Sequence, residues 1–431
     1  MYLLMILVFV LGYAAIVFEH NLKIDKAAAA LLTGIVIWSI YILGGVDIHE
    51  AEHQLLGYFS EISGILFFLL GAMTIVEVVD AHGGFSVITN KVRTNDIRIL
   101  LWIIALLTFF LSSVLDNLTT AIVMISLLRK LIYDQEKRWF FAGIVVIAAN
   151  AGGAWSPIGD ITTTMLWIGG HISAGAIMKD IFLTSMASLV VPLLVLSFTL
   201  RGTVERPKED RGIETSHVSE NEKKVILLAG LGGLIFVPIF KTVTHLPPFM
   251  GMMLSLSVLW ILTDVLHRKK PHEHRHTLGV VGVLKKIDTP SVLFFLGILL
   301  AVVGLQAGGQ LSDLATQLDK TIGTSTEMGV YTIGGIIGLL SAIIDNVPLV
   351  AASIGMYPMG VNSFFAPDGL FWGYLAYTAG TGGSILIIGS AAGVAVMGLE
   401  KIPFGWYVKR ISGLALIGYL SGIVVYILQH S

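Results

Sequence analysis

Two acidic dipeptides, Asp116-Asn117 and Asp345-Asn346, stand in the middle of long apolar stretches of the chain. A carboxylate inside a membrane costs several kcal/mol unless it is neutralised, paired or hydrated, so such a residue is a functional candidate by default. The neighbouring asparagines add amide oxygens, and oxygen-rich anionic sites suit hard cations. We therefore expect each dipeptide to bind a metal ion or a proton.

Two further apolar segments carry paired glycines with polar side chains around them. Small residues there let the backbone and an ion approach each other closely. The first segment holds a second acid, Asp160, where the second holds Ser390, so the first half is the better candidate for proton exchange. We expect Na+ or Li+ to meet Asp116, Asn117, Asp160, Asp345 and Asn346, and the further candidate ligands are Asn150, Ser156, Thr162, Thr163, Thr378, Thr381, Ser384 and Ser390.

Competition of a cation and a proton for one carboxylate is the simplest chemistry of antiport. The cation displaces the proton on one side of the membrane, and the proton displaces the cation on the other. A ligand shared by both substrates also enforces exchange. Glu61 and Asp288, at the mouths of two predicted spans, could gather cations or relay protons.

The composition places these residues in a membrane. The chain is 55% hydrophobic and 13% charged, with a mean hydropathy of +0.84, far outside the range of soluble domains. Apolar runs of roughly 20 residues, long enough to cross a bilayer, recur from Leu3 to Leu428. The absence of cysteine excludes disulfides and thiolate chemistry. The net charge of -2 gives no reason to expect a nucleic-acid partner.

Basic residues indicate the path of the chain. Six clusters hold 24 of the 27 Lys and Arg residues, and because basic loops stay cytoplasmic, all six should lie on one side. The apolar segment between Arg98 and Arg129 has basic residues at both ends, so it should enter and leave on the cytoplasmic side as a re-entrant hairpin. The pair at 328–358 has flanks poor in basic residues, and we expect it to enter from outside.

The same rule predicts about ten spans and two hairpins. The spans 139–168 and 367–398 are longer than needed and have glycines at their centres, which indicates helices broken inside the membrane. The hairpins are 98–131 and 328–358, and the remaining spans lie near 2–19, 27–46, 62–80, 177–200, 223–243, 249–267, 290–308 and 408–429.

The two halves of the chain repeat one another. Residues 66–68 recur at 293–295, residues 112–117 at 341–346, and the glycine pair 152–153 at 382–383, which aligns Glu61 with Asp288 and Asp160 with Ser390. Five crossings in each half is an odd number, so the second half should be inverted. We expect a first repeat at 1–200, a cytoplasmic linker at 201–222 and a second repeat at 223–431.

The strings LDNLTTA, NAGGAWSPIGDITTTMLW, IDNVPLVAA and GAMTIVEVVDAHGGF resemble those of NhaD-type sodium/proton antiporters, members of the ion transporter superfamily. The resemblance covers nearly the whole chain. It implies a homodimer in a bacterial plasma (inner) membrane, an elevator-like motion, sodium or lithium ions and protons as substrates, and no cofactor. It adds Ser341 to the expected functional set, and it places His53 and Glu61 where the family carries ionisable groups.

Two other functions remain open. A sodium-coupled carboxylate or oxyanion transporter of the same superfamily should avoid acids at its hairpin tips, because an anionic substrate would meet like charge. An intramembrane enzyme could use Asp116 and Asp345 as an aspartyl dyad. The many polar partners around each tip favour ion coordination, so we expect a transporter rather than an enzyme.

Overall fold

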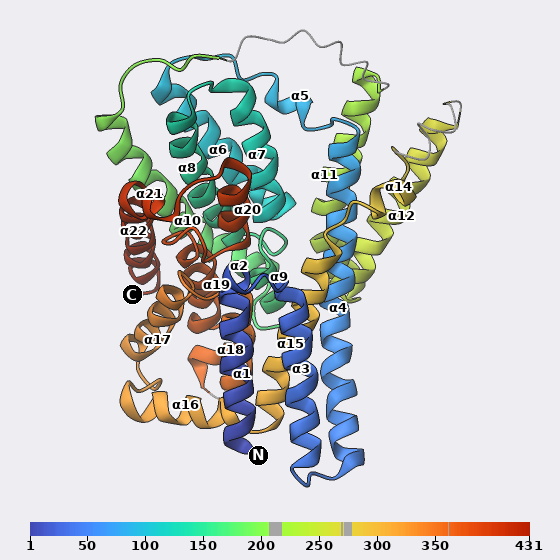
Figure 1. The fold of residues 1–431 in the computed structure, drawn as a ribbon, viewed down its shortest axis with the longest axis vertical. Helices are drawn as coiled ribbons and strands as arrows, with labels where there is room; N and C mark the ends of the chain where they lie inside the picture. The colour runs from blue at the N-terminus through green and yellow to red at the C-terminus, as the bar shows by residue number, and fades with distance from the viewer. Residues whose placement is uncertain (207–217, 269, 271–277, 361) are drawn as a thin grey trace.

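The computed structural model of the protein describes residues 1–206, 218–268, 270, 278–360 and 362–431 (Figure 1). Across these residues the chain is helical, and its one β-type contact is an isolated bridge between Asp96 and Thr203. Eight helices in this part of the chain are long and apolar enough to cross a membrane. The prediction of an all-α polytopic membrane protein is confirmed.

Aspartates begin many helices of the first half. Asp25, Asp47, Asp96 and Asp134 each accept a hydrogen bond from a backbone N–H of the following helix, which satisfies a donor that a helix start leaves unpaired. The helices of this half are α1 (Tyr2–Val17), α2 (Glu19–Leu22), α3 (Lys26–Leu43), α4 (Ile48–Ala81), α5 (Ser86–Thr89), α6 (Ile97–Leu115), α7 (Asn117–Leu131), α8 (Gln135–Ala154), α9 (Ile161–Ile168) and α10 (Ala174–Thr199).

The second half begins with a capping box, in which Ser219 and Glu222 each accept a hydrogen bond from the other's backbone N–H. Its helices are α11 (Glu220–Thr244), α12 (Pro248–His267), α14 (Val280–Leu284), α15 (Thr289–Ala307), α16 (Gln310–Thr321), α17 (Glu327–Leu340), α18 (Asn346–Met356), the 3-10 helix η1 (Ser363–Phe365), α19 (Leu370–Gly382), α20 (Ala391–Glu400), α21 (Phe404–Arg410) and α22 (Ser412–His430).

The helices pack in two groups (Figure 1). The flanking group consists of α1, α3, α4, α11, α12, α14 and α15. The hairpin group consists of α6 to α10 and α17 to α22. Most helix packing occurs within a group, and the two groups meet mainly where α15 packs on α18, α6 on α11 and α4 on α9.

Both predicted hairpins and both predicted breaks are present. The hairpin of α6 and α7 occupies the upper part of Figure 1, and that of α17 and α18 occupies the lower part, so their tips approach from opposite ends. The span expected at 139–168 is divided into α8 and α9, and the span expected at 367–398 into α19 and α20.

Equivalent contacts hold the two hairpins to the two broken helices. Ser112 Oγ donates to the Ala149 carbonyl at 2.6 Å, and Ser341 Oγ donates to the Ala379 carbonyl at 2.7 Å. Gly152 lies against the Phe109 carbonyl, and Gly382 lies in the same way against the Gly338 carbonyl, with no room for a Cβ at either place. The repeat read from the sequence is therefore also a repeat of packing.

Three details differ from the expectations. Helix α4 begins at Ile48 rather than near residue 62, because Asp47 caps it and the polar segment before Glu61 continues the helix. The amphipathic helix α16 was not anticipated. The six basic clusters were expected on one side of the membrane, but helix α2, beside the first cluster, lies near mid-height in Figure 1, away from the end where α6 and α8 begin. Within the expected linker 201–222, residues 207–217 lie outside the described residues.

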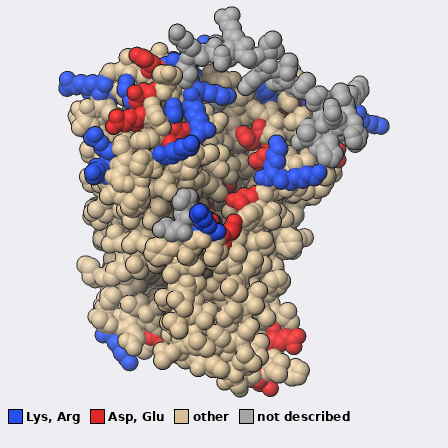
Figure 2. All heavy atoms as spheres, in the orientation of Figure 1, with Lys and Arg blue, Asp and Glu red and all other residues tan. Residues whose placement is uncertain are grey.

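The face of the molecule drawn in Figure 2 carries few charged side chains over much of its area. Figure 2 shows most Lys and Arg residues on this face at the upper end, with a mostly uncharged region below them. Many large apolar side chains, among them Leu228, Ile261 and Leu428, are exposed. Such a surface is suited to lipid.

Candidate functional site

The two predicted aspartates at the hairpin tips cap their own helices. Asp116 begins α7 and accepts hydrogen bonds from the Thr119 N–H and hydroxyl, both at 2.8 Å. Asp345 begins α18 and accepts from the Val347 N–H at 3.2 Å. Asp116 has a backbone φ of +84°, which residues with side chains rarely adopt, so the tip of the first hairpin is strained. Both side chains are partly buried.

The neighbouring asparagines reach inward to one common acid, Asp160. Asn117 Nδ2 donates to Asp160 Oδ2 at 2.7 Å. Asn346 Nδ2, from the opposite hairpin, lies 3.3 Å from each oxygen of the same carboxylate. Asp160 caps α9, accepting from the Thr162 N–H at 2.9 Å and the Thr162 hydroxyl at 2.8 Å, and it is 2% exposed. The sequence repeat alone does not bring both tips to one carboxylate.

Asn150 joins this acid to the second half of the chain. Its side-chain oxygen accepts from Asn117 Nδ2 at 3.1 Å, and its Nδ2 donates to Ser384 Oγ and Ser390 Oγ, each at 2.9 Å. All of these side chains are buried. A continuous polar network therefore connects both hairpin tips with both helix breaks.

The other predicted ligands make hydrogen bonds to backbone groups rather than to the Asp160 carboxylate. The hydroxyls of Ser341, Thr378 and Thr381 donate to backbone carbonyls of α19, and that of Thr163 donates to the Asp160 carbonyl. Ser156 is buried at the break after α8, where its oxygen accepts from the Ile158 N–H at 3.4 Å. These residues shape the site, and their hydroxyls do not bond the Asp160 carboxylate.

The three residues expected to serve ion access lie away from the network. His53 on α4 and Asp288 before α15 are exposed, and Asp288 caps α15 through Ser291. Glu61 lines a cavity of about 480 Å³ between the two helix groups, together with Tyr58 of α4, Ile168 of α9, and residues of α15 and α18.

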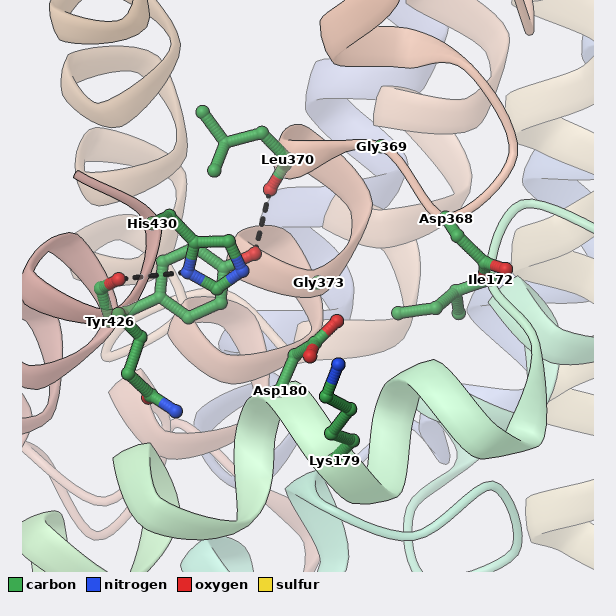
Figure 3. A pocket seen from close by; sticks show the side chains of 10 residues that line it. Ile172, Lys179, Asp180, Asp368, Gly369, Leu370, Gly373, Tyr426 and His430 are labelled. Atoms are coloured by element: carbon green, nitrogen blue, oxygen red, sulfur yellow. Dashed lines mark hydrogen bonds between the residues drawn. The ribbon is translucent and has the colours of Figure 1, made fainter.

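A second cavity, of about 420 Å³, lies between α10, α19 and α22 (Figure 3). Lys179 and Asp180 of α10 line it, facing His430 across the opening. The Tyr426 hydroxyl donates to the Leu370 carbonyl, and His430 Nδ1 donates to the Tyr426 carbonyl, both at 2.9 Å. None of the predicted site residues lines this cavity.

Two contacts at the tips are not expected from the sequence. Thr119 binds the Asp116 carboxylate, and the Tyr13 hydroxyl of α1 accepts a hydrogen bond from the Asp345 N–H at 3.1 Å. The threonine follows the Asp-Asn dipeptide closely enough to be recognised as part of a helix cap. Tyr13 carries no comparable signal, because a single tyrosine in an apolar span usually serves packing.

No basic residue in the described part of the chain pairs with the Asp160 carboxylate. In the described ranges, no Lys, Arg or His forms an ion pair with Asp116, Asp160 or Asp345. Nor does any group of three His, Cys, Asp or Glu residues in those ranges resemble a metal centre. Turning either asparagine amide by 180° would direct its oxygen at the carboxylate site. One carboxylate with amide and hydroxyl oxygens is a ligand set suited to a hard cation or a proton.

Comparison with known proteins identifies the relatives of this chain. Residues 13–373 match the model of the citrate transporter family, CitMHS. Sodium/proton antiporter 2 of Arabidopsis thaliana is 48% identical over 435 residues, which cover 99% of each chain. Sodium/proton antiporter 1 of the same plant is 49% identical over 429 residues, covering 99% of this chain and 72% of that protein.

Bacterial antiporters are similar over the same length. The Na(+)/H(+) antiporter NhaD of Vibrio cholerae is 32% identical over 459 residues, covering 99% of this chain and 91% of that protein. These similarities show that the chain belongs to the CitMHS family and is one of the NhaD-type sodium/proton antiporters.

Proposed function

We propose that the protein exchanges Na+ or Li+ for protons across the membrane, with cation and proton competing for buried aspartates of which Asp160 is the central one. The observation that carries the proposal is the convergence of Asn117 and Asn346, from opposite hairpins, on one buried carboxylate that has no basic partner in the described residues. The names of the relatives support the same substrates.

The exchange follows from the chemistry of a single carboxylate. When a proton is bound, the neutral acid keeps its amide and hydroxyl partners. When Na+ or Li+ is bound, the amides of Asn117 and Asn346 turn their oxygens to the ion and Asp160 supplies the negative charge. Simultaneous binding would place two positive charges on one acid, so one substrate leaves as the other enters. Asp116 and Asp345 contribute negative charge at the two tips.

The two repeats can expose this site to the two sides of the membrane in turn. We propose that residues 1–200 and 223–431 are inverted repeats joined by a cytoplasmic linker at 201–222, and that the hairpin group moves as an elevator against the flanking group. The protein acts as a homodimer in a bacterial plasma membrane.

The family description favours one other candidate, a sodium-coupled carboxylate transporter. An anionic substrate at this site would meet Asp160 and the aspartates at both tips, and like charges oppose its binding. An aspartyl enzyme is less consistent with the geometry, because Asp116 and Asp345 each cap their own helix and no hydrogen bond of the described residues joins them.

Everted vesicles or proteoliposomes with a pH-sensitive dye test the proposal. Addition of Na+ or Li+ should release protons, whereas K+ or citrate should not. Vesicles with the Lys224→Met variant, altered at an exposed position of α11, provide a matched control for expression and sealing. Citrate uptake driven by Na+, without Na+-dependent proton movement, would replace this function with the carboxylate transporter.

A further inference from the structure

The C-terminal end of α9 faces the flanking group. Trp167, in its last turn, is buried, and Phe68 of α4 meets it edge-on with ring centroids 6.4 Å apart. Met165, Ile168 and the following Gly169 line the cavity of about 480 Å³ between the groups. This end of α9 is therefore in contact with the flanking group on one side and with open space on the other.

Lys241 of α11 crosses from the flanking group to this helix end. Its Nζ donates to the Trp167 carbonyl at 2.8 Å and lies 4.7 Å from the centroid of the Trp167 ring. Three attractions coincide here: a charge-assisted hydrogen bond, a cation–π contact and the negative end of the α9 dipole. A solvated or snorkelling lysine would direct its ammonium group to water, whereas that of Lys241 binds another helix.

Helix α9 connects this lysine with the ion site. It has 8 residues, or roughly 12 Å at 1.5 Å per residue, with Asp160 as its N-cap and the Trp167 carbonyl at its other end. A rigid element of this length transmits a shift of one end to the other. Whatever fixes the Trp167 end against the flanking group also fixes the position of Asp160 relative to that group.

We propose that Lys241 is a positioning residue that latches α9, and with it Asp160, against the flanking group in the arrangement seen here. The inference rests on the proposed function, because a latch matters to transport only if the two groups move. The Tyr13 hydroxyl also crosses the interface, to the Asp345 N–H. That contact is neutral, so the charged contact of Lys241 is the stronger of the two.

The movement can be measured directly in the full-length protein. Because the chain has no cysteine, spin labels can be placed at two introduced cysteines, Glu136→Cys on α8 and Glu220→Cys on α11, both at exposed positions in different groups. Lys241→Met removes the charge and the donor at similar length, Lys241→Arg retains both, and Lys224→Met is the control on the same helix.

We expect the distance distribution of Lys241→Met to show a second population, with its ratio to the first raised about tenfold, or 1.4 kcal/mol. Lys241→Arg and Lys224→Met should keep the distribution of the parent protein. An unchanged distribution in a folded Lys241→Met protein would overturn the latch. If that variant does not fold, Lys241→Gln, which keeps a neutral donor, should shift the distance distribution less but in the same direction. An unchanged distribution in a folded Lys241→Gln protein would then overturn the latch.

Transport kinetics separate a latch from general damage. In Lys241→Met, the apparent KM for Na+ should change in opposite directions at the two membrane faces, measured in everted and right-side-out vesicles. Lys241→Arg should keep both KM values of the parent protein. A fall in maximal rate alone, equal on both faces, contradicts the proposal. If the parent protein exchanges no Na+ for protons, the proposed function fails, while the distance measurement still decides whether Lys241 latches α9.

Discussion

The two halves of the chain repeat their packing and differ in their charge. Asp160 and Ser390 occupy equivalent places after a helix break, and each caps the half-helix that follows: Asp160 accepts from the Thr162 N–H at 2.9 Å, and Ser390 from the Gly393 N–H at 3.2 Å. Asn150 likewise corresponds to Gly380. Both halves repeat the geometry that builds a hairpin and a helix break, whereas the carboxylate that the asparagines of both tips reach comes from the first half alone.

Replacing Asp160 should produce the largest effect. Asparagine is as good a helix cap as aspartate, so Asp160→Asn should leave a folded protein that does not exchange Na+ for protons, as measured by dye-loaded vesicles. The equivalent change in the second half, Ser390→Ala, removes the helix cap of α20 and the hydrogen bond with Asn150. The lost bond with Asn150 should cost about 1 kcal/mol, or about fivefold in apparent Na+ affinity. Equal losses in the two variants would contradict the assignment of the charge to the first half.

Asp116→Asn and Asp345→Asn test whether the tips share the chemistry of Asp160. Each substitution keeps the cap on its own helix, so a loss of exchange in a folded protein reports the missing charge. We expect both variants to lose exchange in the same vesicle assay. Retained transport would remove that aspartate from the mechanism and leave it a structural cap.

The ion pairs of Glu400 join the two halves of the chain away from the site, and their contribution to the free energy of unfolding can be measured. Its buried carboxylate, in α20, forms ion pairs with Arg129 Nε at 2.7 Å and Arg138 Nε at 2.6 Å, both from the first half. Glu400→Gln should lower the unfolding free energy by about 3 kcal/mol, because two guanidinium groups lose their partner. Thermal unfolding in detergent is the measurement, and Glu220→Gln, at an exposed ion pair within α11, should leave the midpoint unchanged.

The glycine contacts test the equivalence of packing. Gly152→Ala and Gly382→Ala each force a Cβ against a hairpin carbonyl, and each should cost about 1–3 kcal/mol of stability by overpacking. Gly398 on α20 has open space around it, so Gly398→Ala should be neutral or slightly stabilising. Very different unfolding midpoints for the first two variants would show that the repeat is less regular than its contacts suggest.

The smallest predicted effect concerns the histidines that join α4 of the first half to α12 of the second. His82 and His267 stack with ring centroids 5.0 Å apart, and their Nε2 atoms lie 3.2 Å apart. Burial lowers the pKa of His82, although its bond to the Val78 carbonyl and the nearby Glu222 oppose the shift and Lys270 adds to it.

Because the pKa of His82 is lower in the folded state, the stability contributed by the neutral ring is complete above about pH 6.5 and is lost as the pH falls through the folded-state value. The unfolding midpoint should therefore decrease on acidification, and His82→Leu should reduce that dependence. His49→Gln, at an exposed position of α4, serves as the control. An unaltered pH profile in His82→Leu would mean that other groups set the acid response.

Most of the fold could be predicted because its signals are local. Hydropathy marks the spans, basic clusters mark their ends, and glycine pairs mark the breaks at α8–α9 and α19–α20. The same signals misplaced the start of α4. The segment from Glu50 to His53 is mostly polar, so its hydropathy does not mark it as part of a span. It is nevertheless helical, because Asp47 caps α4 before it and the helix extends beyond the apolar segment.

The sequence by itself determined that polar tips and helix breaks exist, that they occur twice, and that the first half carries the additional acid. Only the tertiary structure decided that the asparagines and not the aspartates bind the common carboxylate, and that Lys241 holds the other end of its helix. The physical reason is that a residue's solvent preference and cap propensity depend on its neighbours in the chain, whereas its hydrogen-bond partner depends on how distant helices meet.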